Sequence, residues 1–243
     1  MIQSFHPALP WPVRLETALR LAWVRVTVPR LPPPPGPQGV IEGEAPALRL
    51  VGIGDSIVAG IGVREQANGL VAQVAARLAR GGRAVRWVSL GQAGATAPAL
   101  PLLLEAARRE RPDLVLLSCG VNDIVRGQPA AELAAALEDC YRRALAAWPA
   151  VQIVHAGIPP LERFPALQGW LGRLLGAHGD ACIAAARLAS ERTGARYSPF
   201  PSAVSSTAFA RDGFHPNERG CAAWADSIAA TIAAGAAPAG RRA

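Results

Sequence analysis

The sequence predicts an α/β domain in which helices cover both faces of a parallel sheet. Short apolar runs alternate with longer Ala- and Leu-rich stretches five times between residues 48 and 233. The short runs have the length of buried strands, and the longer stretches have the length of helices. With 243 residues and 51% hydrophobic content, the chain is long enough to bury one substantial core.

The elements follow one another in a regular order. Strands are expected over residues 48–53, 84–90, 113–119, 151–156 and 195–199, where apolar residues run almost without interruption. Helices are expected over residues 67–80, 98–110, 130–147, 167–193 and 217–233. Each helix follows one strand, and this alternation predicts a five-stranded parallel sheet.

Composition divides the chain into three parts. Residues 1–45 form an N-terminal arm that ends in the stiff, proline-rich segment LPPPPGPQG at 31–39. Residues 46–235 form the main domain, and residues 236–243 form a flexible tail. The arm mixes apolar residues with arginines over 13–28. We expect it to pack on its own domain, and weak contact with a membrane surface is the alternative.

The charge of the chain excludes several classes of function. The net charge is +7, but all 25 basic residues are arginines and no run of them is longer than two. Scattered arginines do not form the continuous basic surface of a nucleic-acid-binding protein, so we expect no nucleic-acid partner. The absence of lysine excludes a P-loop, a Schiff-base cofactor site and a Ser-Lys dyad.

Cysteine and histidine usage argues against a metal site. The four cysteines are widely separated, with no Cys-x-x-Cys pair, and the chain has only four histidines. We therefore expect no metal, no cofactor, and free thiols in a reducing compartment. The sequence also has no signal-like N-terminus and no apolar run of 18 residues, so the cytoplasm is the expected location.

Polar residues suited to acyl transfer follow several of the predicted strands. Ser56 lies in GDS after the first strand, Gly94 after the second, and Asn122 in Gly-x-Asn-Asp after the third. Asp212 and His215 form Asp-x-x-His before the last helix. A serine becomes nucleophilic when a histidine takes its proton and a carboxylate orients that histidine. The Ser56 and Gly94 amides and the Asn122 side chain are candidate donors to the developing oxyanion.

These four blocks, in this order, resemble those of the SGNH (GDSL-type) serine hydrolases over residues 48–233. The resemblance implies a flavodoxin-like three-layer αβα sandwich. It also implies a metal-free esterase with Ser56, Asp212 and His215 as the catalytic triad, and Ser56, Gly94 and Asn122 as the oxyanion hole. The substrate would be a small-molecule carboxylic ester.

Three alternatives remain beside this interpretation. His155, at the end of the fourth strand, is a rival base, although it has no carboxylate nearby in the sequence. A thioesterase or lysophospholipase would use the same site, and a catalytically silent ligand-binding domain belongs to a different class. An intact set of triad and oxyanion residues argues against the silent domain.

The acyl length is predicted from one loop. Residues 157–171 form the longest connection near the site, and three prolines stiffen it. We expect a shallow acyl pocket for short chains, lined by Ile158, Leu161, Phe164 and Trp170. The packed start of a helix is the alternative interpretation of these residues.

Overall fold

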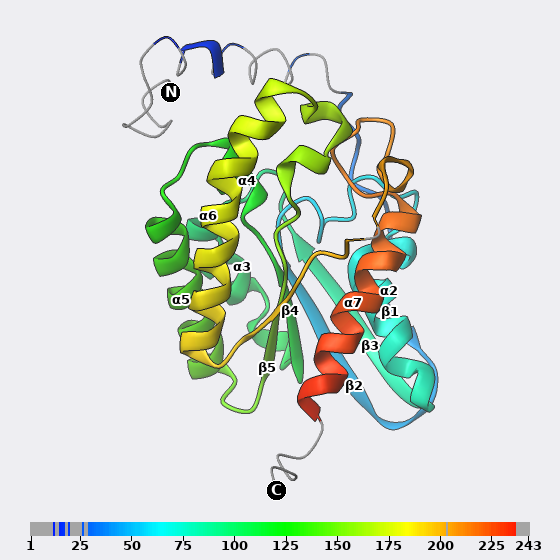
Figure 1. Ribbon diagram of the computed structural model, residues 1–243. Helices are drawn as coiled ribbons and strands as arrows, with labels where there is room; N and C mark the ends of the chain where they lie inside the picture. Colours follow the sequence, from blue (N-terminus) through cyan, green and yellow to red (C-terminus); the bar gives the residue numbers. More distant parts are fainter. Residues whose placement is uncertain are drawn as a thin grey trace, which may run out of the picture.

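A single twisted sheet with helices on both faces forms the centre of the molecule (Figure 1). The computed structural model describes residues 29–202 and 204–236, together with residues 12, 15–17, 19 and 26. The strands are β1 (Gln38–Ile41), β2 (Glu44–Gly54), β3 (Arg83–Gly91), β4 (Leu114–Ser118), β5 (Gln152–Ala156) and β6 (Arg196–Ser198). The helices are α2 (Leu70–Leu78), α3 (Leu100–Ala106), α4 (Val121–Val125), α5 (Ala130–Ala147), α6 (Trp170–Thr193) and α7 (Glu218–Ala236).

The three-layer α/β architecture predicted from the sequence is confirmed, but the strand count is corrected from five to six. The sheet order is β1-β3-β2-β4-β5-β6, and all neighbouring pairs are parallel except β1 with β3. The additional strand, β1, has only four residues, and they alternate between exposed and half-buried. A short edge strand of this kind has no apolar run, so it gives little signal in the sequence.

Two cores hold the layers together, one on each face of the sheet. On β2, Val51 and Ile53 pack into the core beneath α3, α5 and α6, whereas Leu50 packs into the core beneath α2 and α7. Because successive strand residues point to opposite faces, a strand buried on both sides must be apolar throughout. This requirement explains why the strands appear as continuous apolar runs in the sequence.

The proline-rich segment lies against the domain and leads into β1. The Pro35 carbonyl accepts a hydrogen bond from the Gln66 amide at 3.1 Å, and the Pro37 carbonyl accepts one from the Ser89 amide at 2.7 Å. The domain boundary at residue 46 stays a prediction, and β1 and the start of β2 lie before it. The amphipathic part of the arm at 13–28 lies mostly outside the described residues, as does the tail after Ala236.

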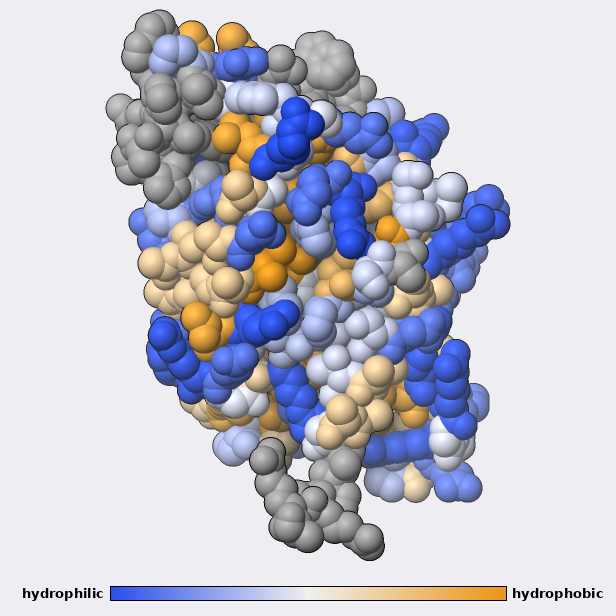
Figure 2. Space-filling view, viewed as in Figure 1, coloured by the Kyte–Doolittle hydropathy of each residue, from blue (hydrophilic) through white to orange (hydrophobic). Residues whose placement is uncertain are grey.

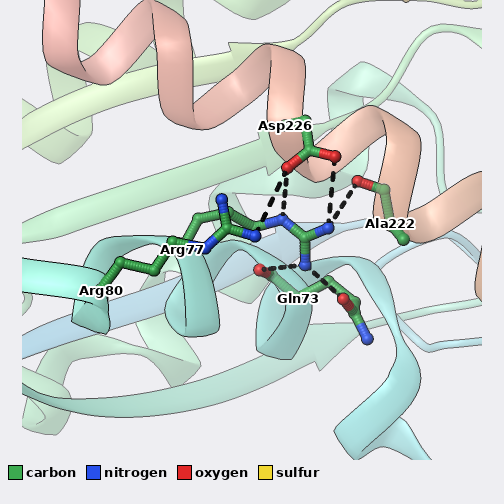
Figure 3. Close-up of polar contacts among 5 residues, drawn as sticks. All are labelled: Gln73, Arg77, Arg80, Ala222 and Asp226. Atoms are coloured by element: carbon green, nitrogen blue, oxygen red, sulfur yellow. Dashed lines mark hydrogen bonds and ion pairs between the residues drawn. The ribbon is translucent and has the colours of Figure 1, made fainter.

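A half-buried arginine joins the two helices on one face of the sheet (Figure 3). Arg77 on α2 donates through Nε to Asp226 Oδ1 at 2.8 Å and through Nη2 to the Ala222 carbonyl at 3.0 Å, both on α7. Its Nη1 donates to the carbonyl and the side-chain oxygen of Gln73, within α2. All three guanidinium nitrogens are therefore engaged, and they tie α2 to α7 through polar contacts above the apolar core.

The strand order reverses at β2, which places one strand end at a crevice. β2 is the first parallel strand in the chain, and its neighbours β3 and β4 lie on opposite sides of it. In an open α/β sheet, ligands bind at such a point, beyond the carboxyl ends of the strands. Ser56 follows the end of β2 by two residues, at this position.

Candidate active site

Ser56 sits in a tightly packed turn immediately after β2. The turn begins at Gly54, where a Cβ atom would lie only 2.0 Å from the Ser118 carbonyl oxygen of β4. Glycine is therefore needed for the strands to approach each other at this point. The turn is closed by hydrogen bonds from the Ala59 amide to the Asp55 carbonyl at 3.0 Å and from the Ile61 amide to the Ser56 carbonyl at 3.0 Å.

The structure brings Ser56, His215 and Asp212 together as a continuous hydrogen-bonded chain. His215 Nε2 lies 2.9 Å from Ser56 Oγ, and His215 Nδ1 lies 2.6 Å from Asp212 Oδ2. Ser56 is 7% exposed and Asp212 is 4% exposed, while His215 is partly accessible. This is the arrangement in which a carboxylate fixes the histidine and leaves Nε2 to accept the serine proton.

The segment that carries the base is folded back on itself. The Ala210 amide donates to the His215 carbonyl at 2.8 Å, and Asp212 Oδ1 accepts from the Phe214 and His215 amides at 2.9 and 3.0 Å. Asp212 thus holds both the backbone and the ring of His215. Spacing by three residues makes this double contact possible within one turn.

Hydrogen bonding decides the charge state of Asp212. Burial by itself raises the pKa of Asp212, but hydrogen bonds from the His215 ring and from the Phe214 and His215 amides outweigh burial and lower that pKa below its usual value. Asp212 is consequently a carboxylate over the physiological pH range. A carboxylate facing Nδ1 favours the tautomer with a proton on Nδ1, which leaves Nε2 as an acceptor.

Asn217 was not predicted as a site residue, although it organises the same segment. Its Nδ2 donates to the Thr207 and Phe209 carbonyls at 2.8 and 2.9 Å. Its Oδ1 accepts from the Arg219 and Gly220 amides at the start of α7, which is the role of a helix N-cap. The signal for the cap is present in the sequence, because an asparagine stands at the start of the predicted helix 217–233, and the observed helix begins one residue later.

Two of the predicted oxyanion donors, Gly94 and Asn122, lie on neighbouring segments that are joined through the Ala95 carbonyl. Gly94 has φ of +78°, a left-handed conformation that favours glycine. Within the described parts of the chain, the Ser56 and Gly94 amides donate to no protein acceptor. Asn122, on α4, donates one N–H of its side chain to the Ala95 carbonyl at 3.0 Å, which leaves its second N–H free.

Asp123 on α4 and Arg126, which directly follows this helix, also contact the Gly94 loop. Asp123 is fully buried, and its Oδ1 accepts from the Ala97 amide at 3.0 Å. Arg126 is exposed, and its Nη2 donates to the Gly94 carbonyl at 2.8 Å. In the sequence both residues resemble ordinary loop polar residues, because α4 is too short to produce a helical pattern.

His155, the rival base, is buried away from solvent. It is 0% exposed, and its ring stacks on Tyr197 at a centroid distance of 5.3 Å. Burial lowers the pKa of His155 to about 4, so the ring is neutral at physiological pH. Its surroundings are those of a core histidine, and the contact to Ser56 is made by His215.

The predicted acyl-wall residues are mostly part of the interior. Ile158, Leu161 and Phe164 are at most 2% exposed and belong to the larger core, and Trp170 is half-buried against it. A cavity about the size of one water molecule, roughly 10 Å³ by volume, lies among apolar side chains. It is lined by Ile57, Pro159, Phe164, Phe200, Val204, Ala208, Phe209, Phe214, Pro216, Gly220 and Trp224. Only Phe164 of the predicted set lines this cavity, so the acyl wall stays a prediction.

Among the described residues, no group of three or more His, Cys, Asp or Glu side chains is arranged to hold a metal ion. Within the same residues, no helix has both the length and the apolar character needed to cross a membrane.

Comparison with known proteins agrees with the geometry. The sequence profile of the GDSL-like Lipase/Acylhydrolase family matches residues 53–223. No curated protein matches the chain. The solved structure of TesA is 25% identical, with a TM-score of 0.62 over 76% of this chain and 97% of TesA.

Two other solved structures share the fold at lower identity. The psychrotrophic esterase EstA from Pseudoalteromonas sp. is 20% identical, with a TM-score of 0.62 over 76% of this chain and 97% of EstA. A mutant of an acetyl-xylooligosaccharide esterase from Geobacillus is also 20% identical, with a TM-score of 0.59 over 81% of this chain and 97% of the esterase.

Proposed function

The chain belongs to the GDSL-like Lipase/Acylhydrolase family and is a carboxylic ester hydrolase, and from this premise we propose that it works through a covalent acyl-enzyme on Ser56. The observation that carries the proposal is the chain of hydrogen bonds from Ser56 through His215 to Asp212, at 2.9 and 2.6 Å. A serine held in this way has its proton acceptor already in place.

In the first half-reaction, Ser56 Oγ attacks the ester carbonyl carbon while its proton moves to His215 Nε2. The carbonyl oxygen takes up the negative charge and is held by the Ser56 and Gly94 amides and by Asn122 Nδ2. When the tetrahedral intermediate collapses, the bond to the alkoxy oxygen breaks. His215 gives its proton to that oxygen, and the alcohol leaves.

In the second half-reaction, water replaces the alcohol. His215 takes a proton from the water, whose oxygen attacks the acyl carbon of Ser56. Collapse of this intermediate breaks the acyl–Oγ bond, returns the proton to Ser56 and releases the acid. Asp212 stays ionised throughout and stabilises the imidazolium form of His215.

Active-site labelling tests the mechanism. We expect a fluorophosphonate probe to modify Ser56, as located by peptide mass spectrometry. Ser56→Ala and His215→Ala should remove both labelling and turnover of p-nitrophenyl acetate, whereas His155→Ala should retain both. Labelling of another residue in active protein, or equal losses in the two histidine variants, would show that the proposed nucleophile or base is wrong.

We also propose that the substrate is a small ester with a short acyl chain. Support comes from the apolar residues of 157–171, most of which pack into the core, and from the cavity beside Phe164, which has room for about one water molecule. A thioesterase or lysophospholipase with the same residues is the second candidate. The free donors at Ser56 and Gly94 speak against a silent ligand-binding domain, because such a domain has no need to keep an empty oxyanion hole.

The proposed partners and cellular location of the enzyme are argued from its surface charges and its cysteines. Many arginines pair with acidic residues, among them Arg49 with Asp113 and Arg143 with Asp139, and we propose no nucleic-acid partner. Hydrophilic residues are spread over the face in Figure 2 and are not gathered in one patch. The four cysteines are free and buried, which supports a reducing, cytoplasmic location.

A further inference from the structure

The loop that carries Gly94 is held by α4 and by the residue that directly follows this helix. Asn122 and Asp123 on α4 contact the Ala95 carbonyl and the Ala97 amide, and Arg126, the C-cap residue of α4, contacts the Gly94 carbonyl. Asn122 and Asp123 are at least half-buried, whereas Arg126 reaches the loop from the solvent side. The three contacts fall on successive parts of the loop, so each fixes a different peptide group.

Gly94 is the residue of this loop that most needs such support. Glycine adopts positive and negative φ with similar ease, so its own conformation does not fix the direction of its N–H. The Gly94 N–H and the Gly94 carbonyl belong to successive peptide groups that meet at the same Cα. A hydrogen bond to the carbonyl therefore restrains the rotation that would turn the N–H away.

The Arg126 contact is the direct restraint on Gly94 itself. Its length of 2.8 Å is that of a strong hydrogen bond from a charged donor. The Gly94 amide, in contrast, has no protein acceptor among the described residues. The Gly94 carbonyl is thus held by a hydrogen bond, whereas the Gly94 N–H remains available to a ligand.

We propose that Arg126 is a positioning residue of the oxyanion hole, which holds the Gly94 carbonyl and thereby keeps the Gly94 N–H directed at the oxygen of the tetrahedral intermediate. The inference rests on the proposed function, because it needs an oxyanion formed by attack of Ser56. Arg126 touches neither the ester nor the reacting atoms. Its effect passes through the backbone of Gly94.

This role differs from the binding of an anionic substrate. A guanidinium that binds substrate contributes in the ground state, and its loss raises KM. A guanidinium that places an oxyanion donor contributes in the transition state, and its loss lowers kcat. The two roles are therefore separated by kinetics on an uncharged ester.

The experiment compares Arg126→Ala and Arg126→Lys with the full chain, using p-nitrophenyl acetate. Complete loss of one oxyanion donor costs ~10²–10³ in kcat, so a donor that is only misdirected should cost about 10-fold, with KM within about 2-fold. Arg126→Lys keeps a cationic donor and should recover most of this loss. Arg196→Ala is the matched control, because Arg196 also donates to backbone carbonyls, those of Ile232 and Gly235, at the opposite ends of the strands.

A second measurement separates positioning from general loosening of the fold. Asn122→Ala and Arg126→Ala act on the same oxyanion, so the double variant should lose less than the product of the two single losses. Thermal unfolding of each variant shows whether the protein is folded at the assay temperature. Multiplicative losses in kcat, an effect on KM alone, or an unchanged kcat in Arg126→Ala would overturn the inference.

Labelling of Ser56 and the kcat of Arg126→Ala together distinguish failure of the positioning role from failure of the acyl-enzyme mechanism. If fluorophosphonate labels Ser56 in the wild-type protein while Arg126→Ala keeps full kcat, the positioning role fails and the acyl-enzyme stands. If active wild-type protein is not labelled at Ser56, the acyl-enzyme fails, and the positioning role fails with it.

Discussion

At the scale of single residues, the nucleophile has a buried acid beside it. Asp55 is 2% exposed, and its Oδ1 accepts a hydrogen bond from the Ile57 amide at 3.0 Å. Burial raises the pKa of Asp55 to about 7, although the Ile57 amide and the nearby His215 act in the opposite direction. The neighbouring Asp123 adds to the increase. Asp55 is therefore protonated in a large fraction of molecules near neutral pH.

This shift predicts a pH-dependent cost in stability. An unfolded aspartate loses its proton near pH 3.9, whereas the folded Asp55 keeps it up to about pH 7. Between these values the folded state binds more protons, so the free energy of unfolding should fall as pH rises, by a few kcal/mol in total. Asp55→Asn keeps an acceptor for Ile57 and should remove this part of the pH dependence.

Urea unfolding at pH 5 and pH 7.5 measures the effect. Relative to the wild-type protein, Asp55→Asn should gain stability at the higher pH. Asp139→Asn is the control, because Asp139 is about half exposed and paired with Arg143. Curves for wild type and Asp55→Asn that stay parallel across this range would contradict the prediction.

Ser56, Asp212 and His215 could be predicted from the sequence for a physical reason. Asp212 and His215 act within one turn, so their relationship is visible as spacing, and Ser56 is marked by the glycine on which close strand packing depends. The contact between Arg126 and Gly94 is not visible in the sequence in this way. The partner of Arg126 is a backbone carbonyl 32 residues away, and a backbone carbonyl leaves no mark in the sequence.

At the scale of elements, the contact of α2 with α7 depends on Arg77 as well as on apolar packing. The Arg77 side chain is 11% exposed, whereas that of Asp226 is 57% exposed. Arg77→Ala should lower the free energy of unfolding by about 2 kcal/mol, because the partly buried oxygens of Gln73 and Ala222 lose their donor together with the Asp226 carboxylate. Asp226→Asn should cost less than about 1 kcal/mol, since an exposed carboxylate is readily solvated.

Chemical denaturation of the two variants checks this order. Arg143→Ala, which removes an exposed pair within α5, is expected to cost no more than about 0.5 kcal/mol. If Arg77→Ala is as mild as Arg143→Ala, then apolar packing alone holds α2 against α7.

The sequence predicts some helices and strands much better than others. The helix expected over 130–147 is found with the same bounds, because its length and amphipathic pattern are unambiguous. β1 and α4 were missed, being four and five residues long. Both are stabilised by partners distant in the chain: β1 pairs with β3, and α4 contacts the Gly94 loop.

At the scale of the whole molecule, the packing of the core is expected to limit the size of the substrate. Most of the apolar side chains of 157–171 are committed to the core, and the cavity near the site holds about one water molecule. Each methylene buried contributes about 0.8 kcal/mol only while a pocket can receive it. We therefore expect kcat/KM on p-nitrophenyl esters to peak at about two to six acyl carbons.

A series of esters from acetate to palmitate tests this expectation. Phe164→Ala should enlarge the cavity and move the optimum toward longer chains, whereas Leu188→Ala, at an exposed position on α6, should leave it unchanged. A value of kcat/KM that keeps rising to long chains in the wild-type protein would favour the lysophospholipase or thioesterase alternative.

The separation of Ser56 and His215 in the sequence also has a consequence for the nascent chain during synthesis. The two residues are 159 positions apart, so the nucleophile leaves the ribosome long before its base is made. At ~5–20 residues per second, this interval lasts on the order of 10 to 30 s. In the proposed mechanism, Ser56 has no partner to take its proton during this interval, so we expect the nascent polypeptide to be inactive toward esters. We expect hydrolysis to begin only when the segment that carries His215 has folded against the turn that carries Ser56, near the end of folding.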